Sequence, residues 1–269
     1  MHNLNRFTDK VAIVTGSASG IGAAVALEFA LEGAAVAIFD INEAAGQAHA
    51  DALTAAGHRA SFYKVDVSDA ALVQRTVDTV AEKYRGVHCL VNSAVSFTAK
   101  GLDVTTPDWD RSLGVNVRGG SNMVQACYPH MKAAGGGAIV NIASISGHIA
   151  QPNRWTYNAT KGAIITLTKC QALDLAPANI RVNVVNPGWI WTPEVDKAAE
   201  FDREKWGPIW GRYHMLRRLG QPSEVARAIL FLCSDDASFI TAAELAVDGG
   251  YLGMGSEGLG ETSSFAGTE

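Results

Sequence analysis

Residues Lys10–Gly22 read KVAIVTGSASGIG and indicate the fold of the chain. It begins with an apolar, β-branched run to Thr15, which is typical of a buried strand. A glycine-rich turn follows at once, and a helical pattern then runs from Ile21 to about Glu32 and stops at Gly33. Glycines let the backbone approach a pyrophosphate closely, and a helix N-terminus offers it free N–H groups and the positive end of the helix dipole. A glycine turn between a strand and a helix therefore predicts a dinucleotide-binding loop.

A second strand, Ala35 to Phe39, ends on Asp40, about 18 residues after Gly22. A carboxylate at this strand end can accept hydrogen bonds from the hydroxyls of an adenosine ribose, and it would repel a 2′-phosphate. No arginine or lysine that would attract such a phosphate stands at the neighbouring loop positions, which are Ser17, Ala18, Ser19, Ile41 and Asn42. The sequence therefore predicts NAD rather than NADP as the cofactor.

Strands and helices continue to alternate along the rest of the chain. We expect further strands at 60–65, 87–91, 138–143, 180–185 and 244–247, helices at about 42–56, 69–84, 157–176 and 222–233, and a long helical region around residue 116. Alternation at these lengths predicts βαβ units, a mainly parallel sheet and right-handed crossovers that place helices on both faces. The predicted fold class is α/β, a doubly wound Rossmann fold with a seven-stranded sheet.

The chain shows no change of composition, linker or internal repeat that would divide it, so residues 1–250 are predicted to form a single domain. Residues 251–269 are rich in Gly, Ser and Glu and lack periodicity, which predicts a flexible C-terminal tail. A second interpretation is that this tail crosses to a neighbouring subunit and helps to close a site there.

The composition excludes several classes of function. Of the 269 residues, 48% are hydrophobic and only 18% are charged, which indicates a large core. A balance of 22 basic and 27 acidic side chains, net −5, gives no reason to expect a nucleic acid as partner. The chain contains no apolar run long enough to span a membrane, and its start, MHNLNRFTDK, lacks the apolar core of a signal peptide. We therefore expect a cytoplasmic protein.

The four cysteines, Cys89, Cys127, Cys170 and Cys233, are widely separated and form no C-x-x-C pair. The histidines show no cluster at metal-ligand spacing. This pattern predicts buried thiols in a reducing compartment and no structural metal.

The second informative stretch, Asn141–Gly162, reads NIASISGHIAQPNRWTYNATKG and holds Ser144, Tyr157 and Lys161. Tyr157 and Lys161 are four residues apart in a helical pattern, so they lie one turn apart on one face. A lysine ammonium nearby favours phenolate and should lower the tyrosine pKa from its usual value of about 10. Ser144 ends an apolar strand, at the edge where ligands bind in open α/β sheets. The stretch therefore predicts a site where a serine hydroxyl holds an oxygen while the tyrosine moves a proton.

The glycine loop, the acid at the second strand end, the serine and the Tyr-x-x-x-Lys pattern occur here in order. With them the chain resembles the NAD-dependent short-chain dehydrogenase/reductase family from Thr15 to about Gly250. The resemblance implies that Ser144, Tyr157 and Lys161 are catalytic, and that Asn116 supports a proton relay through water. It also implies cofactor contacts at Gly16, Ser19, Gly20, Ile21, Gly22, Asp40, Ile41, Asp66, Val67, Asn92, Ser93, Ala94, Tyr157, Lys161, Pro187, Gly188, Ile190 and Thr192.

The chain departs from the family pattern at one position. Where the family usually has glycine after its fourth strand, this chain has Val95, following Asn92-Ser93-Ala94. A branched side chain thus stands where the backbone normally passes close to the nicotinamide ribose. The resemblance further implies a homotetramer, because the family's last helix and strand commonly form a dimer contact within tetramers.

The resemblance implies reversible hydride transfer that interconverts a secondary alcohol and a ketone, or a lactol and a lactone, with Tyr157 as base or acid. The substrate is expected to lie beneath a tryptophan-rich loop, residues 189–215. Its expected contacts are Ser96, Ser144, His148, Gln151, Asn153, Arg154, Tyr157 and Trp189. The polar side chains in this set predict a sugar, polyol or other polyhydroxylated substrate, and hence a role in carbohydrate metabolism. His148 is either a substrate contact or a structural histidine.

Two other functions compete with this one. A 3-oxoacyl-carrier or hydroxysteroid-type reductase of the same family is the first alternative, and the carrier reductase would favour NADPH and a basic residue near Ser17 or Ile41, which this chain lacks. A non-catalytic NAD-sensing protein would be expected to have lost one of the catalytic residues, yet Ser144, Tyr157 and Lys161 are all present. The sequence therefore favours an NAD-dependent dehydrogenase.

Overall fold

The computed structural model describes residues 5–259, which form a seven-stranded sheet in the order β3-β2-β1-β4-β5-β6-β7. Each pair of neighbouring strands in this sheet is parallel. The strands are β1 (Val11–Thr15), β2 (Ala35–Asp40), β3 (Ala60–Lys64), β4 (Cys89–Asn92), β5 (Gly137–Ile142), β6 (Ile180–Pro187) and β7 (Glu244–Val247). The predicted doubly wound Rossmann fold is confirmed.

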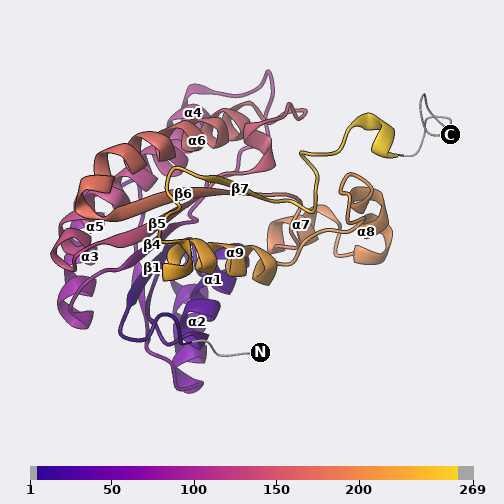
Figure 1. Ribbon diagram of the computed structural model, residues 1–269. Coiled ribbons are helices and arrows are strands. Elements are labelled where there is room, and N and C mark those ends of the chain that lie inside the picture. The colour runs from indigo at the N-terminus through magenta and orange to yellow at the C-terminus, as the bar shows by residue number, and fades with distance from the viewer. Residues whose placement is uncertain (1–4, 260–269) are drawn as a thin grey trace.

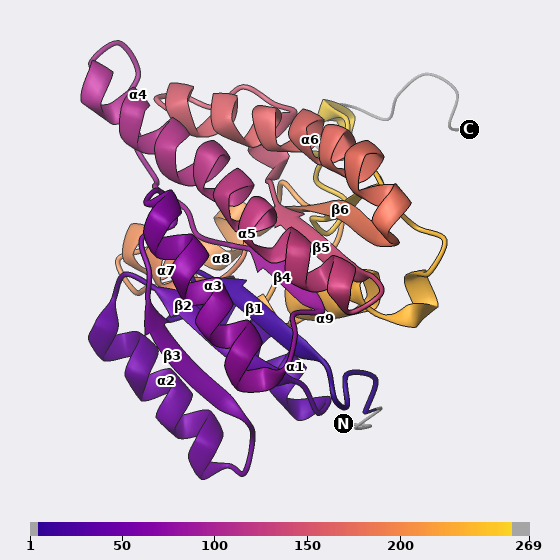
Figure 2. The ribbon, with the colours of Figure 1, turned by 90° about the vertical axis from the view of Figure 1, so that its left-hand side faces the viewer.

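Helices cover both faces of the sheet (Figure 1). One face carries α3 (Ala70–Tyr84), α5 (Gly120–Ala133) and α6 (Trp155–Leu175), and the other carries α1 (Gly20–Leu31), α2 (Glu43–Ala55) and α9 (Pro222–Cys233). A further helix, α4 (Thr106–Leu113), continues through the π-helical segment Gly114–Gly119 into α5, and Figure 2 shows this long rod along the sheet.

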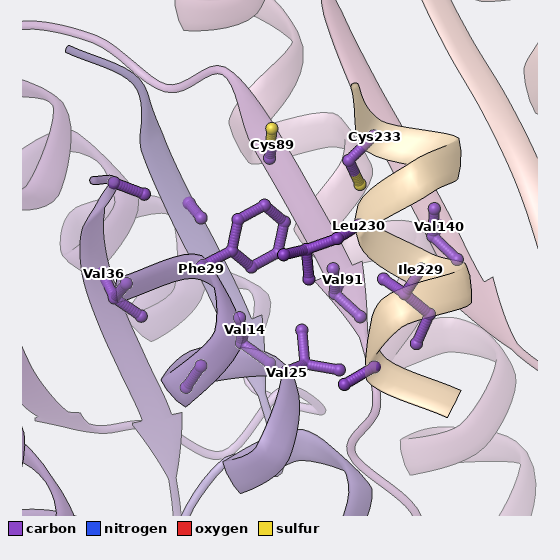
Figure 3. Packing of buried hydrophobic residues seen from close by; sticks show 14 of the residues in the cluster. Val14, Val25, Phe29, Val36, Cys89, Val91, Val140, Ile229, Leu230 and Cys233 are labelled. Carbon is purple, nitrogen blue, oxygen red and sulfur yellow. The ribbon is translucent and has the colours of Figure 1, made fainter. Parts of the chain in front are cut away.

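The core follows from the alternation of side chains along buried strands. Within β1, Ala12 and Val14 belong to the apolar cluster beneath α1, α2 and α9, whereas Val11 and Ile13 belong to the cluster beneath α3, α5 and α6. Figure 3 shows the first cluster, in which Phe29 of α1 lies against the side chains of α9 above the sheet. Because both faces of each central strand are buried, these strands are mainly apolar, as is usual for parallel strands.

Three of the four cysteines, Cys89, Cys127 and Cys233, are buried, as predicted. Cys170 is exposed instead, because it lies on the face of α6 that is turned away from the sheet. For this residue the prediction of a buried thiol is wrong.

The order of the strands reverses at β1, whose neighbours are β2 on one side and β4 on the other. Chain segments leave the carboxyl ends of β1 and β4 close together, and the hydroxyl of Thr15 accepts hydrogen bonds from the backbone N–H groups of Ser93 and Ala94, each at 3.0 Å. Gly16 has φ +62°, and a Cβ there would lie 2.8 Å from the Cα of Ala94. Only glycine therefore fits at this position, which opens the crevice where α/β sheets bind ligands.

The predicted substrate loop, 189–215, contains two short helices, α7 (Pro193–Ala198) and α8 (Arg203–Gly211). They lie together to one side of the sheet in Figure 1. Thr192 caps α7 by accepting a hydrogen bond from the backbone of Val195, and an ion pair between Arg203 and Asp196 joins the two helices at 2.6 Å.

The first part of the predicted tail packs against this region. The ring of Tyr251 lies 5.3 Å from that of His214, and the guanidinium of Arg217 donates to the carbonyl of Gly258 at 2.5 Å. A 3-10 turn occupies Ser256–Leu259. The rest of the predicted tail, with any contact to a neighbouring subunit, lies outside the described residues.

Within residues 5–259, no helix has the length and hydropathy that a membrane crossing requires. The same part of the chain contains no group of three or more His, Cys, Asp or Glu side chains arranged to hold a metal ion.

Candidate active site

A cavity of about 950 Å³ lies at the carboxyl edge of the sheet. It is lined by the segments that follow β1, β2, β3, β4, β5 and β6, and by α7. Nearly all of the predicted cofactor contacts line it: Gly16, Ser19, Gly20, Ile21, Gly22, Asp40, Ile41, Asp66, Val67, Ser93, Ala94, Tyr157, Lys161, Pro187, Gly188, Ile190 and Thr192. The structure thus brings residues from almost the whole length of the chain to one site.

The three predicted catalytic side chains meet in this cavity. Ser144 follows β5, and its hydroxyl accepts a hydrogen bond from the backbone N–H of Ser146 at 3.1 Å. Tyr157 and Lys161 lie one turn apart on α6, with the Lys161 ammonium 5.5 Å from the centre of the Tyr157 ring. The same ammonium donates to the carbonyl of Ile142 at 2.7 Å, which fixes the lysine against the end of β5.

The pKa of Tyr157 is raised above its usual value, mainly because burial disfavours the phenolate. A hydrogen bond with Ser144 and the positive charge of Arg154 act in the opposite direction. Burial also lowers the pKa of Lys161 to about 8. The expectation that Lys161 gives Tyr157 a lowered pKa is therefore wrong for this structure, in which the groups that favour the phenolate are Ser144 and Arg154.

Asn116 lies behind the cavity, inside the π-helical segment. Its side-chain amide donates to the carbonyl of Ser96 and to the hydroxyl of Thr160, both at 3.0 Å, and its oxygen accepts from the N–H of Ser96 at 2.7 Å. These three bonds tie the segment after β4 to the catalytic helix. Asn116 is not among the described residues that line the main cavity. Its hydrogen bonds support the position of the wall that carries Ser96.

A second, small cavity of about 20 Å³ lies beside Asn116 and is also lined by Asn92 and Asn141. Its polar lining and its volume suit a single water molecule. The amide of Asn92 donates to the oxygen of Asn141 at 2.9 Å, and its own oxygen has no hydrogen-bond partner among the described residues. Asn92 was predicted to contact the cofactor, but its side chain faces this inner cavity instead.

The residues at the start of α1 fit the pyrophosphate of a dinucleotide. Within the described chain, Ser19 at the N-cap makes no side-chain capping bond, and the first turn holds no acid that would repel phosphate. A Cβ at Gly22 would lie 2.2 Å from the carbonyl oxygen of Gly16, so a glycine here is required for the tight loop. The bare helix N-terminus therefore presents N–H groups and a positive dipole end to the cavity.

The carboxylate of Asp40 is held in a fixed orientation at the end of β2. One of its oxygens accepts from the backbone N–H of Ala18 and the other from that of Asn42, each at 2.9 Å. Each oxygen keeps a further lone pair that can accept a ribose hydroxyl. Asp40 therefore fits the adenosine end of a nicotinamide dinucleotide.

The predicted substrate contacts Ser96, Gln151, Arg154 and Trp189 line the same cavity as Tyr157. Gln151 accepts a hydrogen bond from the hydroxyl of Ser146 at 2.6 Å, which leaves its amide N–H groups for other partners. The remaining two predicted contacts, His148 and Asn153, are not among the described residues that line the cavity.

His148 and Asn153 have other positions. His148 pairs with Glu244 of β7 and lies 3.3 Å from the amide nitrogen of Asn186, so it occupies the structural role that the sequence left open. Asn153 has φ +56°, and its oxygen packs so closely on Gly101 that a Cβ there would lie 2.7 Å away.

Apolar side chains that the sequence analysis did not assign to the substrate site form much of the wall around the catalytic residues. Val95, Phe97 and Val195 line the cavity, and the ring of Phe97 lies 4.9 Å from that of Tyr157. Val95 and Phe97 are 48% and 47% exposed, respectively. The sequence could have indicated Val95 and Phe97, because two large apolar residues just after a strand end lie where α/β sheets bind ligands.

Comparison with known proteins agrees with this site. Residues 16–252 match the protein family described as "Enoyl-(Acyl carrier protein) reductase". The chain is 40% identical to cyclopentanol dehydrogenase of Comamonas sp. (strain NCIMB 9872) over 92% of this chain and 99% of the relative. It is 42% identical to cis-4-hydroxycyclohexanecarboxylate dehydrogenase of Sinomonas cyclohexanicum over 92% of this chain and 98% of the relative. It is 38% identical to D-threitol dehydrogenase of Mycolicibacterium smegmatis over 91% of this chain and 94% of the relative.

These relatives are similar over nearly their whole length and are named as dehydrogenases of alcohols. The family match, residues 16–252, includes most of the glycine loop together with Ser144, Tyr157 and Lys161. The chain therefore belongs to the short-chain dehydrogenase/reductase family, and it is an oxidoreductase that interconverts secondary alcohols and ketones with a nicotinamide dinucleotide.

Proposed function

We propose that the protein is an NAD-dependent dehydrogenase of a small cyclic secondary alcohol. The observation that carries the proposal is the apolar wall beside the catalytic residues, formed by Val95, Phe97, Trp189 and Val195. Such a wall suits a hydrocarbon ring, because burial of apolar surface stabilises the complex. Two of the relatives are named for ring alcohols, cyclopentanol and a hydroxycyclohexane carboxylate.

In the direction of oxidation, the bound nicotinamide supplies the hydride acceptor. The hydroxyl of Ser144 holds the carbinol oxygen by a hydrogen bond, and the phenolate of Tyr157 accepts the proton of the alcohol. Ser144 and the positive charge of Arg154 favour the phenolate against the effect of burial. Lys161 lines the same cavity, anchored to Ile142, and can hold a cofactor hydroxyl with its remaining N–H groups. For ketone reduction the proton moves back from Tyr157 to the oxygen.

The preference for NAD rests on Asp40. Its carboxylate lies in the cavity and is held by two backbone N–H groups, so it cannot swing away from a 2′-phosphate. The loop positions around it carry no basic side chain that would offset the repulsion. A 3-oxoacyl-carrier reductase that uses NADPH is correspondingly disfavoured.

A sugar or polyol is the second candidate substrate, as the sequence predicted. Gln151 and Arg154 in the cavity wall favour it, and D-threitol dehydrogenase is among the relatives. His148 and Asn153 lie outside the wall, so two of the polar contacts that the sequence suggested do not face the cavity. For this reason we favour a cyclic alcohol over a polyol as the substrate. A role in carbohydrate metabolism would apply only if the substrate is a sugar or polyol.

The homotetramer and the cytoplasmic location remain predictions that rest on the family resemblance and on the sequence. Light scattering after size-exclusion chromatography tests the first: a mass of four chains supports it, and a monomer contradicts it.

The proposed function is tested by following NADH or NADPH formation over cyclopentanol, cyclohexanol, threitol, other polyols, hydroxy acids and steroid alcohols. We expect ring alcohols to be oxidised with NAD, and with NADP at least about tenfold less efficiently, since losing a charged contact costs about this much. Turnover confined to polyols would favour the second candidate. Turnover confined to steroid alcohols, or with NADP alone, would contradict both.

A further inference from the structure

We propose that Arg154 forms an anion subsite, so that the substrate is a ring alcohol that carries a carboxylate on the side of the ring away from the reacting carbinol. The inference rests on the proposed function and deepens it, because it names the group that distinguishes the substrate from a plain ring alcohol.

The guanidinium of Arg154 is held at a defined place in the catalytic cavity. Arg154 is the residue before α6, whose first turn carries Tyr157. Its guanidinium carbon lies 4.7 Å from the centre of the Phe97 ring, and that ring lies 4.9 Å from the Tyr157 ring. These two contacts place the guanidinium carbon at most about 9.6 Å from the centre of the Tyr157 ring. One small molecule can therefore reach both side chains.

Arg154 has no carboxylate partner within the described part of the chain, whereas other arginines do. Arg6 pairs with Glu32, Arg203 with Asp196 and Arg218 with Glu224. Four carboxylates also line the cavity, but residues 5–259 show no ion pair between Arg154 and any of them, which are Asp40, Asp66, Asp110 and Glu194. A cation that lines a binding cavity without a counter-charge is complementary to an anionic ligand.

The shape of the subsite favours a carboxylate. A guanidinium presents paired N–H groups in a rigid plane, which match the two oxygens of a carboxylate. Packing over Phe97 fixes the place of the guanidinium before ligand binds, so little side-chain entropy is lost on binding. The neighbouring Val95 and Trp189 suit a hydrocarbon ring rather than further charged groups.

The positive charge of Arg154 also acts on Tyr157, since it opposes the rise of the tyrosine pKa. A loss of activity on replacing Arg154 is thus ambiguous by itself, because it would follow from a changed tyrosine as well. The test must compare substrates within each protein, so that the effect on Tyr157 cancels.

The experiment measures kcat/KM with NAD for 4-hydroxycyclohexanecarboxylate, its methyl ester and cyclohexanol, in the wild type and in Arg154→Gln. We expect the ratio of acid to cyclohexanol to fall by about 10- to 100-fold in the variant, the usual effect of losing a charged hydrogen bond. The ratio of ester to cyclohexanol should change little. Arg154→Lys should restore part of the preference for the acid, and Arg227→Gln, which removes a charge on α9 outside the cavity, should leave the ratio unchanged.

Binding without turnover gives a second readout. Cyclohexanecarboxylate should inhibit the wild type in competition with the alcohol, and its inhibition constant should rise about 10- to 100-fold in Arg154→Gln. Equal ratios and equal inhibition in both proteins, with cyclohexanol still oxidised, would overturn the subsite and leave the proposed function standing. If the wild type bound NADH but oxidised none of these alcohols, the proposed function would fail and the subsite with it.

Discussion

At the scale of single residues, burial acts on the two titratable side chains of the site in opposite directions. It raises the pKa of Tyr157 and lowers that of Lys161 to about 8, so it favours the uncharged form of each. Ser144 and Arg154 offset this effect at the tyrosine. The sequence showed the spacing of tyrosine and lysine but not these shifts, because a shift depends on how deeply packing buries each group.

Replacing Lys161 with Met should stabilise the protein at neutral pH. The pKa of Lys161 is about 8 in the folded protein and 10.5 in the unfolded chain, so the buried ammonium destabilises the folded protein below about pH 8. This cost disappears as the pH rises from about 8 to 10.5. This difference in pKa corresponds to a destabilisation of the folded protein by about 3 kcal/mol at neutral pH. The gain in stability of the variant is smaller than this, because the variant also loses the hydrogen bond to the carbonyl of Ile142.

Urea unfolding at about pH 7 and about pH 10 measures this difference in the free energy of unfolding. We expect Lys161→Met to be the more stable protein at the lower pH, with a smaller gap at the higher pH. A wild type that is the more stable protein at pH 7 would show that the ammonium is not destabilising.

Replacing Asp40 with Ala should reduce the preference for NAD over NADP by about tenfold or more, because it removes both a ribose acceptor and the charge that repels a 2′-phosphate. The ratio of kcat/KM for the two cofactors measures this. Asp51→Ala is the control, since Asp51 is an exposed carboxylate on α2 that contacts Gln47. An unchanged ratio in Asp40→Ala would refute the role of Asp40.

At the scale of elements, four tryptophans hold α7 and α8 beside the cavity. The Trp210 ring lies 5.0 Å from Trp189, 4.9 Å from Trp206 and 6.3 Å from Trp191. The sequence analysis predicted a tryptophan-rich loop over residues 189–215 and no helix there. Short helices leave no clear periodicity in the sequence, and here they are held by the tryptophan packing together with the Thr192 cap and the Arg203–Asp196 ion pair.

Trp210→Ala should loosen the part of the cavity wall that Trp189 forms, because the Trp210 ring packs directly on the Trp189 ring. We expect KM for the alcohol to rise by about tenfold while NADH binding changes little, with partial loss of helical order at α7–α8. Phe239→Ala, at a side chain that is 103% exposed, serves as the control for loss of an aromatic ring. Steady-state kinetics and hydrogen exchange over residues 189–215 measure both effects. An unchanged KM would contradict the inference that Trp210 supports Trp189 in the cavity wall.

At the scale of the whole molecule, the strands could be predicted closely and the contacts between distant segments could not. The expected strand 35–39 is β2, Ala35–Asp40, because a buried parallel strand is an apolar run bounded by turn residues. The expected strand 244–247 is β7, which lies at the edge of the sheet and is only partly buried. The pair His148–Glu244 joins positions that are 96 residues apart, and the bonds of Asn116 likewise join distant segments. Such contacts follow from the fold and leave no local pattern.

The packing of α1 against α9 fixes the glycine loop at the end of β1. Leu230 is fully buried there, and Figure 3 shows it among the side chains between α1 and α9. Leu230→Ala should lower the free energy of unfolding by about 2 to 5 kcal/mol, through lost burial and a residual cavity. Leu102→Ala, at a side chain that is 88% exposed, should change it by less than about 0.5 kcal/mol. Denaturant titration measures both, and equal effects would contradict the assignment of the core.

We propose that Tyr157 moves the proton while hydride passes between the alcohol and NAD. NADH formation from cyclohexanol in the wild type and in Tyr157→Phe, with NADH affinity measured in both proteins, tests this role. We predict that kcat falls by about 10²- to 10⁴-fold in the variant, the usual contribution of a general base, while the affinity for NADH is preserved. A variant that retains the wild-type kcat would contradict the mechanism.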